Sequence, residues 1–227
     1  TFKEIVPVFS ISSVTGENVD TLRFFINNVP SYRVYDSDNK DVDFVVESRF
    51  TLNGIGLVVS GIVKVGKISR GDNLYLGPIE GEFKKIAIKS IHNNFKEEVP
   101  YLLAGNGGAF NIKLAPGGGK IRMKSIRKGS HILSNPKLYR RFVAQVLILH
   151  HPTTIRKKYQ PYLHCGNISQ SCEIYDMDKE YLRIGDKGIV KFRFMYKPEF
   201  INKGDRIIFR EGKSKGVGLI TEVFNDE

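Results

Sequence analysis

The sequence is poor in cysteine and has no long hydrophobic run. Only two cysteines, Cys165 and Cys172, occur among 227 residues, which argues against a secreted domain built on disulfide bonds. No segment approaches the stretch of about 20 apolar residues that a membrane-spanning helix requires, and no signal peptide opens the chain. These absences predict a soluble, cytoplasmic protein with no membrane partner.

The sequence also lacks the phosphate-binding loop of nucleotide-hydrolysing enzymes. Neither GxxxxGK(S/T) nor DxxG or NKxD occurs, and a phosphate site needs glycine amides at a helix start with a lysine to neutralise the charge. The run Gly117–Lys120 is followed by Ile121 rather than by serine or threonine, so it does not fit this loop. We therefore expect these residues to hold no cofactor and no catalytic group.

Acidic residues are outnumbered by basic ones. The chain has 35 Lys and Arg residues against 24 Asp and Glu residues, which gives a net charge of +11. This balance favours a polyanionic partner such as nucleic acid. A lysine-rich protein without such a partner is the alternative that charge alone leaves open. The hydrophobic content of 41% is enough to build real cores.

Residues 1–35 differ from the rest of the chain. A short apolar strand is expected at Val6–Ile11, followed by a small-residue loop at Ser12–Gly16 and an amphipathic helix over Glu17–Val29 that Pro30 ends. One strand and one helix cannot bury a core alone. We therefore interpret residues 1–35 as the end of a domain whose beginning is absent.

Strand patterns dominate the remainder. Residues 36–43 are acidic and polar and predict a linker. Five glycines punctuate residues 51–72, and the runs Leu57–Val59 and Ile62–Val65 predict short strands joined by tight turns. Further strands are expected at Phe44–Phe50, Lys84–Ile91, Gly107–Lys113, Phe142–Leu149, Tyr159–Cys165, Lys187–Tyr196, Arg206–Arg210 and Gly216–Val223. This pattern predicts a mainly β protein with two tandem closed β-barrels, at residues 44–136 and 137–227.

The order of glycines, valines and isoleucines over residues 50–72 resembles the second domain of translational GTPases, the class of elongation factor Tu and elongation factor 1-alpha. In the second barrel, His150–Ile155 together with His164–Gly166 resembles the GTP-binding protein 1 family of this superfamily. The resemblance covers nearly the whole chain. It implies the end of an α/β G domain followed by the β-barrel domains II and III.

The resemblance also implies what the whole protein binds. Ser12, Ser13 and Val14 resemble the last guanine-contacting loop of a G domain, with Val14 where the family has lysine. A protein of this family is a GTPase that uses GTP and Mg²⁺, whereas these residues alone, without the phosphate loop, are expected to be inactive. The implied partners are tRNA or the ribosome, together with the protein's own G domain.

Domain II of elongation factors holds the terminal adenosine of aminoacyl-tRNA. The resemblance places this acceptor-end pocket at Leu52, Gly54, Gly56, Leu57, Val58 and His92. His92 stands where the family has a glutamate, which departs from the pattern for aminoacyl-tRNA delivery. A histidine on a surface turn is the alternative interpretation of His92.

The second barrel carries a basic loop. Arg156-Lys157-Lys158-Tyr159 places three cations beside an aromatic residue, which suits a phosphate-backbone clamp with a stacking partner. A solvated loop is the alternative. With the resemblance, the expected RNA- or partner-binding set is Arg156, Lys157, Lys158, Tyr159, His164, Arg210, Gly212, Lys213 and Lys215.

Zinc is not expected near the two cysteines. His164 and Cys165 are neighbours on a strand and point to opposite faces, and no CxxC or HxxxH spacing occurs. Buried free cysteines of a β core are the better interpretation.

Three functions remain open at this stage. The first is tRNA or ribosomal RNA binding by domains II and III of a translation-elongation-like GTPase. The second is a protein-interaction module of a release or ribosome-rescue GTPase that grips a tRNA-shaped partner, which the departure at His92 favours. The third is a free-standing RNA-binding barrel protein, against which the segment Ser12–Val29 argues.

Overall fold

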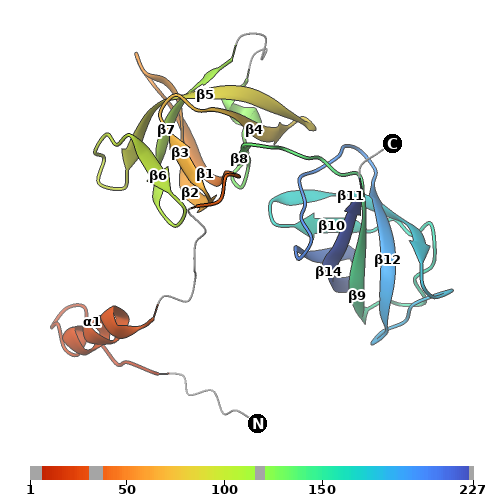
Figure 1. Cartoon of the computed structure of the whole chain (residues 1–227). Helices are drawn as coiled ribbons and strands as arrows, with labels where there is room; N and C mark the ends of the chain where they lie inside the picture. Colours follow the sequence, from red (N-terminus) through yellow and green to blue (C-terminus); the bar gives the residue numbers. More distant parts are fainter. Residues whose placement is uncertain (1–6, 31–37, 116–120, 225–227) are drawn as a thin grey trace. The chain divides into compact units, whose positions relative to one another are not determined.

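The computed structural model describes residues 7–30, 38–115 and 121–224, and the chain divides into two units, at residues 1–34 and 35–227 (Figure 1). The first unit contains helix α1 (Val19–Asn28), and none of the helical residues is buried. Residues 7–11 form no strand, contrary to the expectation for Val6–Ile11, of which Val6 lies outside the described residues. The reason is physical: a strand needs a partner for its backbone groups, and the described part of this unit offers none.

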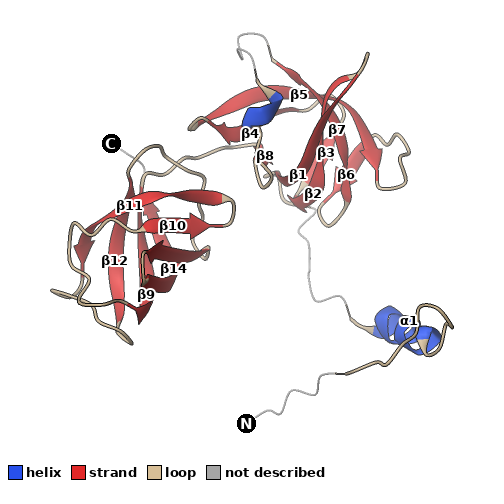
Figure 2. Ribbon diagram, turned by 180° about the vertical axis from the view of Figure 1, so that it is seen from behind, coloured by secondary structure: helices blue, strands red, loops and turns tan. Residues whose placement is uncertain are grey.

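The second unit contains two closed barrels of six strands each, so the predicted fold class is confirmed (Figures 1 and 2). The first barrel has the order β1–β2–β7–β5–β4–β8. Its strands are β1 (Asp43–Leu52), β2 (Gly56–Val65), β4 (Asn73–Ile79), β5 (Glu82–Asn93), β7 (Gly107–Leu114) and β8 (His131–Leu133), and β3 (Lys67–Ser69) pairs with β6 (Tyr101–Leu103) beside it. A short 3-10 helix, η1 (Met123–Ser125), precedes β8.

The core of the first barrel follows from the alternation of its strands. Phe44 on β1 and Phe110 on β7 are fully buried, and their ring centroids lie 4.6 Å apart in an edge-to-face pair. The residues that alternate with the buried ones along each strand face outward, because successive residues of a strand point to opposite faces. The outer faces of the strands are thereby free to carry polar groups.

Gly61 lies inside a strand and not in a turn, so the prediction of two short strands within 57–65 is wrong. Strand β2 runs unbroken through it, with Gly61 paired to Val46 on β1 and to Gly108 on β7. A Cβ atom built on Gly61 would lie 1.9 Å from the carbonyl oxygen of Val45. The glycine is therefore needed for close approach of two strands, which is the other common reason for a glycine within a strand.

The second barrel has the order β10–β11–β12–β9–β14–β13. Its strands are β9 (Arg141–His150), β10 (Tyr162–Cys165), β11 (Ile168–Met177), β12 (Lys187–Phe194), β13 (Arg206–Glu211) and β14 (Ser214–Phe224). Phe142 packs at the centre of its core, 5.2 Å from the ring centroids of both Phe192 and Phe194. The strand expected over Tyr159–Cys165 begins at Tyr162 and is shorter than predicted.

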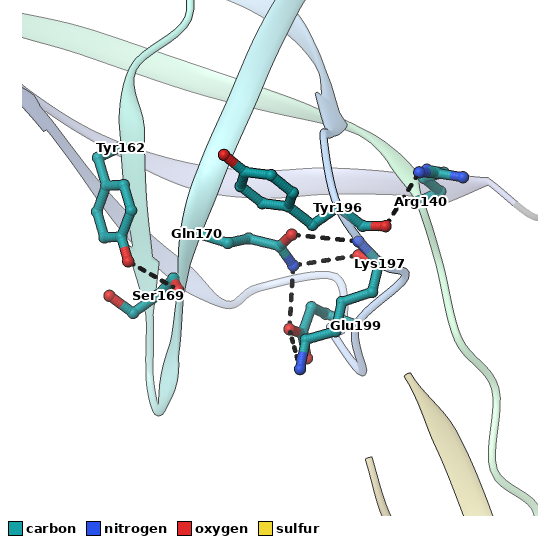
Figure 3. Close-up of polar contacts among 7 residues, drawn as sticks. All are labelled: Arg140, Tyr162, Ser169, Gln170, Tyr196, Lys197 and Glu199. Carbon is teal, nitrogen blue, oxygen red and sulfur yellow. Dashed lines mark hydrogen bonds and ion pairs between the residues drawn. The ribbon is translucent and has the colours of Figure 1, made fainter. Parts of the chain in front are cut away.

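A partly buried polar cluster fixes the turn that follows β12 (Figure 3). The amide nitrogen of Gln170 donates to the carboxylate of Glu199 at 3.0 Å and to the carbonyl oxygen of Lys197 at 3.1 Å. Arg140 donates to the carbonyl oxygens of Phe194, Met195 and Tyr196 at 3.2–3.3 Å. Burial raises the pKa of Glu199, and the charge of Lys197 opposes that rise. These contacts hold the chain segment that presents Met195 and Tyr196 to solvent.

In the parts of the chain that the structure describes, the helices are too short and too polar to traverse a lipid bilayer.

Candidate nucleic-acid interface

Two of the six predicted acceptor-end residues of the first barrel, Val58 and His92, lie on the outer face of β2, β7 and β5. The strand register aligns Val58 with Asn111 and Ser90 in one row, and Ser60 with Ala109 and His92 in the next. Val58 is 6% exposed and is absent from the core cluster, which takes its neighbour Val59 instead. Val58 and His92 therefore share one sheet face, on which Ser60, Ser90 and Ala109 have small side chains.

The other predicted pocket residues lie elsewhere on the same barrel. Leu57 packs against the core, whereas Leu52, Gly54 and Gly56 form the tip of the β1–β2 hairpin. Gly54 and Gly56 have φ values of 78° and 103°, which only glycine adopts readily. Asn111 holds this tip, because its side-chain amide donates to the carbonyl oxygen of Ile55 at 3.2 Å. The structure thus separates the six predicted residues into a hairpin tip, a core position and a two-residue face.

Residues Ser60, Ser90, Ala109 and Asn111 of this face were missed by the sequence analysis. The signal that could have found them is the alternation in β7, where Gly108, Phe110 and Ile112 are buried and the residues between them are only partly buried.

Two cations of the basic loop in the second barrel are ion-paired. Arg156 contacts Glu180 at 2.8 Å, and Lys157 contacts Asp176 at 2.7 Å. Asp176 also contacts Lys191 at 3.0 Å, and the hydrogen bonds from both lysines hold the pKa of Asp176 well below its usual range. These pairs are solvent-exposed, so each is weak and screened by salt. A phosphate group could compete for either cation.

Tyr159 and Lys158 differ in how far they reach into solvent. Lys158 is exposed and adopts a φ of 73°, and its N–H donates to the carbonyl oxygen of Ile174 at 2.7 Å. Tyr159 is partly buried against the core, with its ring centroid 5.4 Å from that of His151. Burial raises the pKa of Tyr159, and the nearby charge of Glu211 acts in the same direction.

The loop at 151–159 lies beside the β13–β14 hairpin. The Nδ1 atom of the buried His151 lies 2.6 Å from the hydroxyl oxygen of Ser214, the first residue of β14. The hairpin turns at Gly212, with a φ of 54°, and at Lys213. The structure thereby brings the basic loop and the predicted hairpin residues to one end of the barrel.

His164, Arg210 and Lys215 share the outer face of β10, β13 and β14. Lys215 pairs in register with Arg210, and Arg210 pairs with Tyr162. His164 is two residues beyond Tyr162 on the same side of β10, and its Nδ1 atom lies 3.1 Å from the hydroxyl oxygen of Ser169. Tyr162 was not among the predicted site residues. Its signal is the alternation at 162–165, where Leu163 and Cys165 are buried and the other two residues are exposed.

The predicted guanine-loop residues form a closed turn in the first unit. The N–H of Gly16 donates to the carbonyl oxygen of Ser12 at 2.9 Å, and the N–H of Thr15 donates to the hydroxyl of Ser12 at 3.2 Å. Val14 is 93% exposed at the tip. The run Gly117–Lys120, which does not fit a phosphate loop, lies outside the described residues.

Both cysteines are buried and unpaired, as predicted. Burial raises the pKa of Cys165 to about 12 and raises the pKa of Cys172 as well. Among the described residues, no group of three or more His, Cys, Asp or Glu side chains is placed to hold a metal ion.

Comparison with known proteins gives relatives over nearly the whole chain, although no protein-family profile matches it. The chain is 40% identical to GTP-binding protein 1 of Xenopus laevis over 225 residues, which are 97% of the chain and 33% of that protein. It is 32% identical to GTP-binding protein 2 of Homo sapiens over 228 residues, 96% of the chain and 37% of that protein. Elongation factor 1-alpha of Methanoculleus marisnigri is 30% identical over 164 residues, 65% of the chain and 36% of that protein.

The chain therefore spans about a third of the length of the curated relatives that it matches. The matches to the two GTP-binding proteins include the helix-containing unit and both barrels, since they cover almost every residue. With this coverage and the paired six-stranded barrels, the chain belongs to the translational GTPase family of GTP-binding proteins 1 and 2 and elongation factor 1-alpha, in the region of domains II and III.

Proposed function

We propose that these residues are the RNA-binding domains II and III of a translation-elongation-like GTPase, with tRNA or ribosomal RNA as the partner. The observation that carries the proposal is the outer face of β10, β13 and β14, where Arg210 and Lys215 align beside Tyr162 and His164. Cations placed beside aromatic rings suit a phosphate backbone and its bases together. The net charge of +11 supports the same class of partner.

GTP and Mg²⁺ belong to the complete protein in this proposal. Ser12, Ser13 and Val14 offer a turn of the type that meets a guanine base, but the sequence holds no glycine-and-lysine loop for the phosphates. The residues present therefore do not form a nucleotide site by themselves. A G domain of the complete protein would bind GTP and reorient against the barrels, in the cytoplasm where its RNA partners lie. In support, α1 exposes Phe24 and Ile26 and buries none of its residues within its own unit.

A second candidate is a protein-interaction module that grips a release- or rescue-factor-like protein shaped like tRNA. The observation that favours it is the pairing of Arg156 with Glu180 and of Lys157 with Asp176, which lowers the free positive charge of the basic loop. The rim of a protein interface is polar and solvent-accessible, as these ion pairs are. Direct RNA binding separates the two candidates.

The test measures binding of an unmodified tRNA transcript by fluorescence anisotropy across a series of salt concentrations. We expect the affinity to fall linearly on a double-logarithmic plot, because bound cations are released from the phosphates. The double variant Arg210→Glu with Lys215→Glu should bind about tenfold or more weakly at low salt, with a shallower salt slope.

The matched control is Lys179→Glu with Lys203→Glu, two exposed lysines on other parts of the same barrel. It changes the net charge of the chain by the same amount. If both double variants lose equal affinity, the binding is a non-specific effect of net charge and the face has no special role. If the unmodified chain binds no tRNA, RNA binding is wrong and the protein-interaction candidate takes its place.

A further inference from the structure

We propose that Tyr162 is a stacking platform for an unpaired nucleobase, so that this face of the second barrel prefers single-stranded to double-stranded RNA. The inference rests on the proposed RNA-binding function and names a ligand class for the same face. It starts from a side chain that is 44% exposed, although it is aromatic and its strand is paired on both sides.

The ring of Tyr162 is held in place by its own neighbours (Figure 3). Its hydroxyl donates to the carbonyl oxygen of Ser169 at 3.1 Å. Its ring meets that of His164 edge-to-face, with centroids 5.4 Å apart, and His164 is in turn placed by the hydroxyl of Ser169. A ring that is already fixed loses little conformational entropy when a ligand stacks on it, which is the usual advantage of a preorganised site.

The surroundings of Tyr162 suit a nucleotide. Arg210 lies opposite Tyr162 on β13, and Lys215 lies opposite Arg210 on β14, so two cations follow on one side at successive spacings of about 4.8 Å. On the other side, Ser171 lies opposite Tyr162 on β11, and its small side chain leaves space beside the ring. Met195 lies beyond Ser171, because its N–H donates to the carbonyl oxygen of Ser171 at 3.0 Å. Its side chain is 36% exposed and offers a polarisable thioether.

This arrangement separates the two parts of a nucleotide. The base has an aromatic face to stack on, and the phosphate has the guanidinium and ammonium groups of the next two strands. A base inside a duplex is already stacked on both sides and cannot use the ring. On the adjacent strand β11, the acidic side chain of Glu173 is paired with Arg193. On β13, the exposed Glu211 follows Arg210, and successive residues of a strand point to opposite faces.

The experiment compares a fluorescein-labelled oligouridylate with a duplex RNA of equal length, using the whole 227-residue chain. Tyr162→Leu keeps an apolar side chain on the strand but removes the π face. We expect it to bind oligouridylate about 5- to 150-fold more weakly, the range for loss of one base–aromatic stack, and to bind the duplex as before. The affinity of Tyr162→Phe for oligouridylate should stay within about threefold of that of the unmodified chain, because only the hydrogen bond of the hydroxyl is lost.

The control variant is Phe95→Leu, which removes an aromatic ring that is 83% exposed at a turn of the first barrel. It should leave both affinities unchanged. Far-UV circular dichroism and thermal midpoints establish that every variant is folded. Equal losses of affinity for oligouridylate and for duplex would show that Tyr162 supports the surface in general and does not stack on a base, and would overturn the stacking role.

An unchanged affinity of Tyr162→Leu for oligouridylate overturns the inference even if the chain binds tRNA, and leaves an apolar peptide as the remaining partner for this ring. Binding of duplex but not of oligouridylate by the unmodified chain overturns it too. Absence of all RNA binding is different, because it removes the proposed function together with this inference.

Discussion

Gly61 offers a direct test of how closely β1 and β2 approach. In Gly61→Ala the new Cβ would start 1.9 Å from the carbonyl oxygen of Val45 and 3.0 Å from the ring of Phe44, a fully buried side chain. Carbon and oxygen atoms do not approach below about 3 Å, so the two strands must separate locally by about 1 Å. That movement strains the ladder between β1 and β2 and overpacks the core.

The expected cost combines two effects. Overpacking costs about 1–3 kcal/mol, and weakened ladder hydrogen bonds cost about another 1–3 kcal/mol, so the free energy of unfolding falls by about 2–6 kcal/mol. For a domain that is stable by about 5–15 kcal/mol this is a large fraction. With a urea m-value of about 2 kcal/mol per molar, the midpoint of the first barrel moves down by about 1–3 M.

The assay is urea unfolding followed by far-UV circular dichroism, since the sequence has no tryptophan. Gly54→Ala is the matched control, because its φ of 78° strains an alanine but no atom lies within 4 Å of the new Cβ. The free energy of unfolding of that variant should fall by only about 1–2 kcal/mol, the cost of the strained backbone conformation. A loss for Gly61→Ala no larger than that for Gly54→Ala would refute the steric argument.

Two further predictions concern buried titratable groups. Cys165 and Cys172 are buried thiols whose pKa values are raised, that of Cys165 to about 12. A thiol-specific disulfide reagent should therefore label them slowly in the native chain and fully in urea. Rapid labelling of the native chain would contradict their burial. For Tyr159, burial raises the pKa in the folded state. Its contribution to stability is therefore complete below the unfolded pKa of about 10 and is lost as the pH rises through and above that value. Tyr159→Phe should remove this alkaline loss, and a difference in thermal midpoint between the two chains that stays constant from neutral to alkaline pH would show that Tyr159 does not cause it.

Several strands with a regular inward alternation of apolar residues could be predicted from the sequence. β7 alternates glycine, phenylalanine and isoleucine inward with alanine, asparagine and lysine outward, and its predicted range 107–113 matches the observed Gly107–Leu114. β11 was missed because two of its inward positions are Gln170 and Cys172. The buried glutamine is tolerated only because Glu199 and Lys197 satisfy its amide, and both lie more than twenty residues away in the sequence.

The candidate site shows the same limit. The charges at Arg156 and Lys157 are evident in the sequence, but their partners Glu180 and Asp176 are about twenty residues further along the chain. Only the packing of this loop against β11 and the turn after it brings them together. Likewise, Tyr162 stands in a short run of alternating residues, and its relation to Arg210 depends on the register between β10 and β13. Local patterns therefore predict elements, whereas pairing across strands decides which side chains meet.

The closure of both barrels limits how any partner can attach. In each ring every strand has two hydrogen-bonded neighbours, so closure leaves little free edge onto which an extended peptide could add as an extra strand. Recognition by the rings must use side chains and turns, and its specificity must change when outward-facing residues change while the backbone stays the same. Variation of this surface can therefore retarget the protein at little cost to folding.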